Sequence, residues 1–196
     1  MIKEGSYINT TIIEERKLNA VTMDVFSRLL MDRIIFLGTA INSDVANIIT
    51  GQLLWLDSID PGKEITMYIN SPGGSVYDGL GLYDLMQYIQ TKGIKIRTVN
   101  IGQACSMAFI LLIGGTKGCR ESLPNCSAMI HELSSGDFGT TSQFEDTAKE
   151  MRRVQTILNE IITKHSNAEL IELCKRKDFW LSAEEALKYN VIDKIL

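Results

Sequence analysis

The feature that most constrains this sequence is a regular alternation of strand-like and helix-like segments. The segments predicted as strands are residues 33–38, 64–70, 94–101 and 127–131. Of the two helices predicted between them, one runs from Ser75 to about Ile89, and the other begins at Ser43 with an apolar face made of Val45, Ile48, Ile49, Leu53 and Leu56. Strands that alternate with helices usually lie parallel in one sheet, so the alternation predicts an α/β fold with a largely parallel sheet.

The last third of the chain is predicted to be helical, because three Ser-x-x-Glu capping boxes occur there. They begin at Ser142, Ser166 and Ser182, and each places a hydroxyl three residues before a carboxylate. The first of these helices is predicted to run from about Gln143 to Lys164, with an apolar stripe at Phe144, Ala148, Met151, Val154, Leu158 and Ile161. A helix that long in a small domain either crosses the sheet or projects toward another subunit, and the stripe favours neither.

Composition limits the class of protein. A chain of 196 residues that is 45% hydrophobic can fill one substantial core. A net charge of −4 without a block of Lys and Arg argues against nucleic acid, and no apolar run reaches the roughly 18–20 residues that span a bilayer. The four cysteines lack paired zinc-ligand spacing, so we expect reduced thiols in a cytoplasmic protein, without a structural metal or a cofactor.

The beginning of the chain differs from the remainder. Residues 1–20 are polar, and we expect them to be mobile or to order only against a partner. No linker, repeat or low-complexity tract interrupts the rest of the chain. Residues 21–196 are therefore predicted to form a single domain.

Two polar residues beside apolar segments, together with a glycine-containing segment, could perform nucleophilic catalysis. Ser106 opens an apolar segment, and His131, one of two histidines, ends another. A serine hydroxyl becomes a useful nucleophile only if a base removes its proton, and imidazole is the base best suited near neutral pH. The glycines of residues 70–75 could direct backbone N–H groups at a developing oxyanion. A nucleophile, a base and an anion cradle are the parts of a serine hydrolase.

Each of these positions also has a purely structural interpretation. Ser106 alone could be a helix-start hydroxyl, His131 a core histidine, and residues 71–74 a plain turn. Residues 71–74 lack the ending of a phosphate-binding loop, and Ser106 is not in a Gly-x-Ser-x-Gly motif, which disfavours the α/β-hydrolase fold. His165, among polar residues, is expected to be solvated, and the cysteines are expected to be inert, with Cys105 of interest only because it precedes Ser106.

Five motifs in order resemble a known family. They are FSRLL (26–30), MYINSPGG (67–74), GQACSM (102–107), LPN followed by MIH (123–131) and LSAEEA (181–186). Together they resemble the proteolytic subunits of the ATP-dependent Clp protease, which are serine peptidases, over residues 22–196. The resemblance implies a crotonase-like spiral of strand-strand-helix units with a protruding helix, here called the handle.

The resemblance also implies roles for individual residues. Ser106 matches the nucleophile, His131 the general base and Asp178 the acid that orients the imidazole. Gly74 and Met107 match the positions whose N–H groups form the oxyanion hole. Chemistry alone cannot select Asp178, which is one of 24 acidic residues.

At the level of the assembly, the resemblance implies two stacked seven-membered rings that enclose a chamber. The rings would contain this chain alone or also a paralogous subunit, with residues 1–20 at the axial entrance. The handle would combine a strand over residues 132–141 with the helix after Gln143, and residues 134–139 would lie along a bound peptide. Unfolded proteins would be supplied by an AAA+ unfoldase, and ATP would be used by that partner.

The sequence departs from the family pattern at several places, which indicates a divergent member. Glu132-Leu133 follows the histidine where the family usually has Gln-Pro, and Arg176-Lys177 replaces an acidic-Arg pair that helps to join the rings. Phe109 and Thr66 also differ, and about three extra residues surround residues 91–93. These departures concern assembly, activation and the choice of unfoldase, and they leave Ser106, His131 and Asp178 intact.

Other functions remain open to the sequence. One is a non-catalytic structural subunit of a mixed ring, against which the intact Ser106, His131 and Asp178 argue. Another is an acyl-CoA-handling enzyme of the crotonase type, which would not need Ser106 and His131 as a pair. A membrane-bound signal-peptide peptidase with a Ser-Lys pair is more distant, since no membrane anchor is evident.

Overall fold

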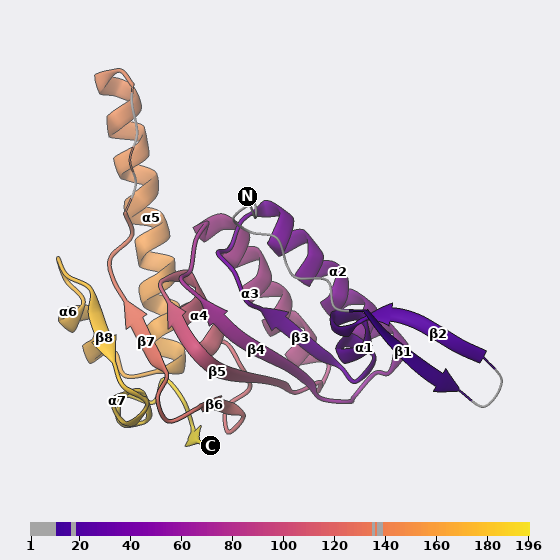
Figure 1. Ribbon diagram of the computed structural model, residues 1–196. Helices are drawn as coiled ribbons and strands as arrows, with labels where there is room; N and C mark the ends of the chain where they lie inside the picture. The colour runs from indigo at the N-terminus through magenta and orange to yellow at the C-terminus, as the bar shows by residue number, and fades with distance from the viewer. Residues whose placement is uncertain (1–10, 17–18, 135, 137–138) are drawn as a thin grey trace, which may run out of the picture.

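In the computed structural model of the chain, the described residues are 11–16, 19–134, 136 and 139–196. Strands and helices alternate through most of this length (Figure 1). In chain order the elements are β1 (Thr11–Arg16), β2 (Asn19–Asp24), α1 (Val25–Met31), β3 (Ile34–Leu37), α2 (Ser43–Ile59), β4 (Ile65–Ser71), α3 (Val76–Thr91), β5 (Ile96–Cys105), α4 (Met107–Ile113), β6 (Arg120–Ser122), β7 (Ser127–Ile130), α5 (Thr141–His165), α6 (Glu169–Leu173), β8 (Phe179–Leu181), α7 (Ala183–Lys188) and β9 (Lys194–Ile195).

A largely parallel sheet forms the centre of the molecule. β3, β4, β5, β6 and β9 are neighbours in that order and pair in parallel. Besides β4, β5 has two parallel partners, β6 along Thr98–Asn100 and β7 along Gln103–Cys105. β8 adds to β7 in the antiparallel sense. The predicted α/β fold with a mainly parallel sheet is therefore confirmed. β5 continues four residues beyond its predicted end, which brings Ser106 to the edge where β7 pairs.

The helices bury the apolar surface of the sheet. α2 and α3 lie side by side on one face (Figure 1), and every residue of α4 is buried, as expected of a helix that is apolar on all sides. The predicted apolar face of α2 was wrong at Ile48, which is 61% exposed. Ile48 lies outside the arc of the helix that faces the core, whose buried residues are Ala46, Ile49, Leu53 and Leu56.

The long helix α5 projects from the domain. Its buried residues, Val154, Leu158, Ile161 and Ile162, all lie in its C-terminal half, whereas residues 141–146 are exposed. Figure 1 shows its N-terminal half standing away from the sheet. Of the two arrangements that the apolar stripe allowed, projection is the one observed.

Two of the three predicted capping boxes were wrong. α5 begins with a capping box of Thr140 and Gln143, two residues before the predicted box of Ser142 and Glu145. Both pairs fit the motif, and the structure uses the earlier one. Ser166 ends α5 instead of starting α6, and its hydroxyl donates to the carbonyl oxygen of Ile162. The box of Ser182 and Glu185 is confirmed at the start of α7.

The strand expected over residues 132–141 is not present in its described part. Residues 132–134, 136, 139 and 140 lie in no strand, and Thr141 is the first residue of α5. A strand needs a pairing partner, and none of the described residues forms a ladder with this segment. The remaining positions of the segment, 135 and 137–138, lie outside the described residues.

The N-terminal expectation falls partly outside the description. Residues 1–10 and 17–18 are not among the described residues. β1 and β2 pair in antiparallel register from Thr11↔Asp24 to Arg16↔Asn19. The predicted mobility of residues 1–20 stays a prediction.

Candidate active site

Ser106 lies at the turn between β5 and α4, where the backbone adopts an uncommon conformation. Its φ is 54° and its ψ is −122°, and such a positive φ is rare for a residue with a side chain. The amide of Ser106 donates to the carbonyl oxygen of Met129 at 2.8 Å, which fastens the turn to β7. Strained residues of this kind cost about 1–3 kcal/mol and persist only where their surroundings enforce them.

Gly73 packs directly against this turn. Its φ is +92°, and a Cβ on it would lie 2.5 Å from the carbonyl oxygen of Cys105 and 2.7 Å from the Cβ of Ser106. Only glycine fits such a close approach of two backbones. A role was expected for the neighbouring Gly74 but not for Gly73, since a Gly-Gly pair in a sequence does not reveal which glycine is crowded.

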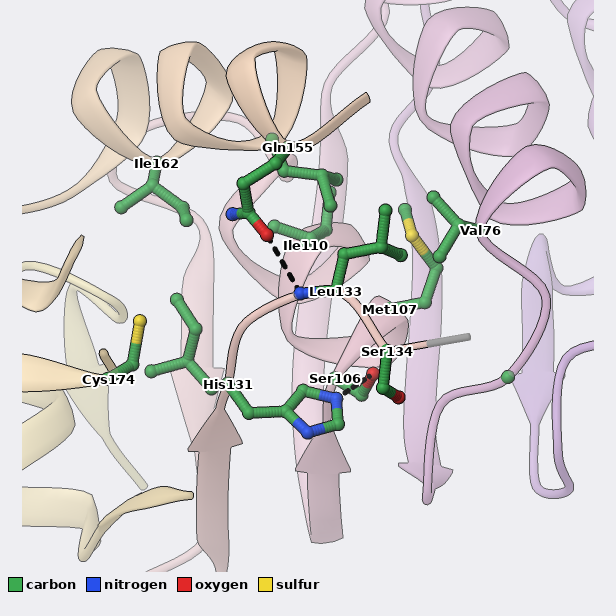
Figure 2. A pocket seen from close by; sticks show the side chains of 13 residues that line it. Val76, Ser106, Met107, Ile110, His131, Leu133, Ser134, Gln155, Ile162 and Cys174 are labelled. Atoms are coloured by element: carbon green, nitrogen blue, oxygen red, sulfur yellow. Dashed lines mark hydrogen bonds between the residues drawn. The ribbon is translucent and has the colours of Figure 1, made fainter. Parts of the chain in front are cut away.

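His131 follows directly after β7, beside the end of β5. The parallel register pairs Cys105 with Met129, so the chain leaves both strands at the same edge of the sheet. The Nε2 atom of His131 lies 2.8 Å from the Oγ atom of Ser106 (Figure 2). The imidazole is thus in position to accept the hydroxyl proton.

Asp178 is brought to His131 by the antiparallel pairing of β7 and β8. The register pairs Ile130 with Phe179, so the residues one step further along the two strands are His131 and Asp178. The distance from His131 Nδ1 to Asp178 Oδ1 is 3.3 Å, and the Asp178 side chain is 57% exposed. The side chains of Ser106, His131 and Asp178 therefore lie in series.

Gly74 and Met107, whose N–H groups were expected to face an oxyanion, both lie beside Ser106 in the wall of one cavity. Gly74, with φ +148°, bridges to Ile41, and the hydrogen bonds of this bridge are made by Gly73 and Ser75. In a parallel bridge the N–H of the middle residue points away from its partner, so that of Gly74 points away from Ile41. Both Gly74 and Met107, the first residue of α4, line the same cavity as Ser106.

The cavity beside Ser106 has a volume of about 250 Å³ and a largely apolar wall. α5 supplies one side of it, and the side chain of Gln155 accepts a hydrogen bond of 2.7 Å from the amide of Leu133 (Figure 2). This bond joins the segment after His131 to the projecting helix. The cavity is lined by Gly74, Val76, Ser106, Met107, Ile110, Ile130, His131, Leu133, Ser134, Gln155, Leu158, Ile162 and Cys174.

A second hollow continues from the first between the start of α3 and the middle of α5. It shares Gly74, Val76, Leu133 and Ser134 with the cavity beside Ser106 and has a volume of about 590 Å³. The hydroxyl of Tyr77 donates to the Glu150 carboxylate across its wall at 3.0 Å. The two hollows together form a path past Ser106 along which an extended chain could lie.

Two other groups that the sequence singled out are not part of the series of Ser106, His131 and Asp178. His165 is half-buried, with Nε2 2.7 Å from the hydroxyl of Tyr83, so the expectation that it is solvated was wrong. Burial, followed by the charges of Lys164 and Arg120, lowers the pKa of His165 to about 4. Burial raises the pKa of the Cys105 thiol, which keeps it protonated at neutral pH beside Ser106.

Neither a metal cluster nor a membrane helix is found where the chain is described. No group of three or more His, Cys, Asp or Glu in the described ranges could hold a metal ion. None of the described helices is long and apolar enough to cross a membrane. All four cysteines are free thiols.

A hydroxyl, an imidazole and a carboxylate in series beside an apolar cavity are an arrangement typical of hydrolytic enzymes. Residues 17–196 match the family model described as Clp protease. The chain is 54% identical to the ATP-dependent Clp protease proteolytic subunit of Porphyromonas gingivalis, over 98% of this chain and 86% of that protein. It is 48% identical to the protein of the same name from Bacteroides fragilis, over 98% of this chain and 93% of the relative.

The chain therefore belongs to the Clp protease family. The resemblance drawn from the five motifs is confirmed, as is the family's α/β fold. Membership of this family supports a peptidase rather than a non-catalytic subunit or an acyl-CoA enzyme.

Proposed function

We propose that this protein is a serine endopeptidase with Ser106 as nucleophile, His131 as general base and Asp178 as the acid that orients the imidazole. The observation that carries the proposal is the 2.8 Å separation of Ser106 Oγ and His131 Nε2, in series with the contact between His131 Nδ1 and Asp178. With Nδ1–H directed at the carboxylate, Nε2 is free of its proton and can accept one.

In the first half of the reaction, Ser106 Oγ attacks the carbonyl carbon of a peptide bond while His131 Nε2 takes its proton. The carbonyl oxygen becomes negatively charged, and the N–H groups of Gly74 and Met107 donate to it. Met107 is the first residue of α4, so its N–H also carries part of the positive end of the helix dipole. Removing one such donor typically costs about 10²–10³ in rate.

The tetrahedral intermediate then collapses. His131 returns the proton to the departing amine, the peptide bond breaks, and an acyl ester remains on Ser106. Water enters, His131 removes one of its protons, and the resulting hydroxide attacks the ester carbonyl. The carboxylic acid product leaves, and the proton returns to Ser106.

The substrate is proposed to be an extended, unfolded polypeptide. The apolar wall beside Ser106 suits an apolar side chain just before the cleaved bond, and the adjoining hollow suits the neighbouring backbone. Recognition of main chain reads little sequence, so we expect loose specificity beyond that one position. The proposed contact of residues 134–139 with the peptide includes positions outside the described residues.

The partner and the assembly are proposed from the relatives' names. Those proteins are called proteolytic subunits of an ATP-dependent protease, and from this we propose an AAA+ unfoldase that uses the ATP. The exposed N-terminal half of α5 fits the role of a handle between two seven-membered rings, made of this chain alone or with a paralogous subunit. Residues 1–20 are proposed to lie at the axial entrance, and the free thiols suit the cytoplasm.

Substitution of the nucleophile tests the proposal. Ser106→Ala is expected to lower the rate of peptide hydrolysis by at least about 10³-fold, because nucleophile and base act as a unit. The particle mass should stay unchanged, since the Ser106 hydroxyl has no structural partner besides His131 in the described chain. Turnover is measured with a fluorogenic peptide alongside native mass, and wild-type turnover by the variant would remove Ser106 from its role.

A further inference from the structure

Asp178 is held more loosely than its role in the triad requires. Its side chain is 57% exposed, and its 3.3 Å separation from His131 Nδ1 is long for a hydrogen bond. The strand β8 begins only after it, at Phe179. The ladder of β7 and β8 holds Asp178 from the Phe179 side only, so the turn that precedes Asp178 supplies the support on its other side.

That turn, residues 174–177, has little internal support. The amide of Lys175 donates to Glu172 and that of Lys177 to Cys174, both over 3.4 Å. Arg176 has a φ of +58°, a conformation that residues with side chains rarely adopt and that surrounding contacts must enforce.

Glu132, two residues after the end of β7, supplies such a contact. Its Oε2 atom accepts a hydrogen bond of 3.0 Å from the amide of Arg176, across 44 residues of sequence. The paired residues of β7 and β8 end at Ile130 and Phe179. The bond from Glu132 thus joins the two segments outside their ladder, two residues after Ile130 and three residues before Phe179, with His131 and Asp178 in between.

We infer that Glu132 is a positioning residue that holds the Arg176 turn and thereby keeps Asp178 within reach of His131. The inference rests on the proposed function, since it concerns the acid of the proposed triad. The essential features are an acceptor oxygen and the length of the side chain, rather than the charge.

Two substitutions separate reach from charge. Glu132→Gln keeps an acceptor oxygen at the same distance and loses the charge, so its kcat for a fluorogenic peptide should stay within about 2-fold of wild type. Glu132→Asp keeps the charge and shortens the side chain by one methylene, so kcat should fall roughly 3- to 10-fold with little change in KM.

The matched control is Glu172, which lies in α6 just before the turn of residues 174–177. Glu172→Asp makes the same change in an exposed carboxylate whose ion pair is with Lys175, within its own turn. Its kcat is expected to match the wild type. Native mass of every variant shows that the assembly is retained.

A double-mutant cycle shows whether Glu132 acts through Asp178. In an Asp178→Asn background, Glu132→Asp should change kcat by less than about 2-fold, because there is no longer an acid to position. A purely structural role for Glu132 would lower kcat equally in both backgrounds. Additive effects in the cycle would therefore overturn the inference.

The remaining outcomes also decide. A loss of kcat in Glu132→Gln as large as that in Glu132→Asp would show that the length of the side chain alone does not explain its role. Wild-type kcat in Glu132→Asp would show that the length of the side chain does not matter. Either result overturns the inference, provided that Asp178→Asn alone is impaired. Full activity of Asp178→Asn would overturn the proposed role of Asp178 itself, so failure of the two proposals can be distinguished.

Discussion

The backbones of Gly73 and Ser106 are in contact, and each residue has a positive φ that limits which amino acid the position can accept. The crowding around Gly73 comes from the carbonyl oxygen of Cys105 and the Cβ of Ser106, the residues that form the nucleophile turn. A side chain at Gly73 would push this turn away from His131. The geometry of Ser106, the proposed nucleophile, is thus set partly by Gly73, which has no reactive side chain.

Gly73→Ala is expected to lose both stability and activity. The added methyl group meets backbone atoms that cannot move away, and a positive φ is unfavourable for alanine, so the free energy of unfolding should fall by about 2–4 kcal/mol. Peptide hydrolysis should fall by at least about 10-fold, because a small misplacement of a nucleophile has a large effect on rate.

The control for this substitution is Gly62→Ala. Gly62 has nearly the same backbone angle, φ +98°, but a Cβ there would meet nothing within 4 Å. This variant should lose only the cost of the backbone angle, about 1 kcal/mol, and keep its activity. Urea unfolding and peptide turnover measure both quantities, and equal losses in the two variants would contradict the crowding of Gly73.

At the scale of single residues, sequence chemistry finds the proposed nucleophile and base but not the proposed acid. Ser106 and His131 can be selected because each borders an apolar segment and their side chains complement each other. Asp178 becomes special only through the register of β7 against β8, which no local pattern encodes. Ile48 was misassigned for a related reason, since the apolar pattern of α2 does not state which part of a broad face meets the core.

Among the elements, α5 is connected to α3 by the contact of His165 with Tyr83. The two rings meet edge to face with their centroids 5.7 Å apart, and Tyr83 is only 4% exposed. Burial of the phenol raises the pKa of Tyr83 to about 12, so its hydroxyl stays protonated and can donate to the neutral imidazole. This contact fixes the end of the helix whose other end projects.

The free energy of unfolding is expected to decrease as the pH is lowered, because of the contact between His165 and Tyr83. The pKa of His165 is lowered from 6.5 to about 4 in the folded protein, so the unfolded chain takes up a proton at a higher pH. The free energy of unfolding should therefore decrease as pH falls from about 6.5 to 4, by about 1–2 kcal/mol once solvent screening of a half-buried group is considered.

His165→Gln isolates this contribution. Glutamine can still accept a bond from Tyr83 but does not titrate. The difference in unfolding free energy between wild type and variant should change across this pH window. Other titrating groups, such as the Asp193 carboxylate paired with Arg120, cancel in the comparison. A difference that is constant from pH 7 to about 4 would contradict the lowered pKa.

The existence of the elements was easier to predict than their ends. The four predicted strands are present because branched and apolar residues cluster there, between helical segments. Helix starts were misplaced where two capping motifs overlap, at Thr140 and Ser142, because local chemistry permits either. The strand expected over residues 132–141 failed in its described part because strand formation depends on a partner that sequence does not supply.

For the molecule as a whole, the projecting half of α5 is the feature with the clearest consequence for assembly. Phe144 is 49% exposed on it, together with charges such as Glu145 and Lys149. A helix with half its length outside the domain gains packing only from another subunit. Arg176 and Lys177, which are exposed near the site, are further positions where acidic residues of a facing subunit would make contact.

Particle mass is expected to depend on ionic strength. Attraction between the Arg176-Lys177 turn and acidic residues of a facing subunit would be screened as salt rises from about 0.05 to 0.5 M, so the mass should decrease. Lys177→Gln should lessen this dependence. Light scattering measures the mass, and a value identical across that range for the wild type would count against charged contacts between subunits.

The central claim, that His131 and Asp178 activate Ser106 in the assembled protein, is tested most directly by labelling with a fluorophosphonate. This reagent forms a bond only with an activated serine hydroxyl, and intact mass with peptide mapping locates it. We predict one adduct per chain, on Ser106, in a large particle. A full-sized particle without an adduct, or with an adduct on another serine, would contradict the claim.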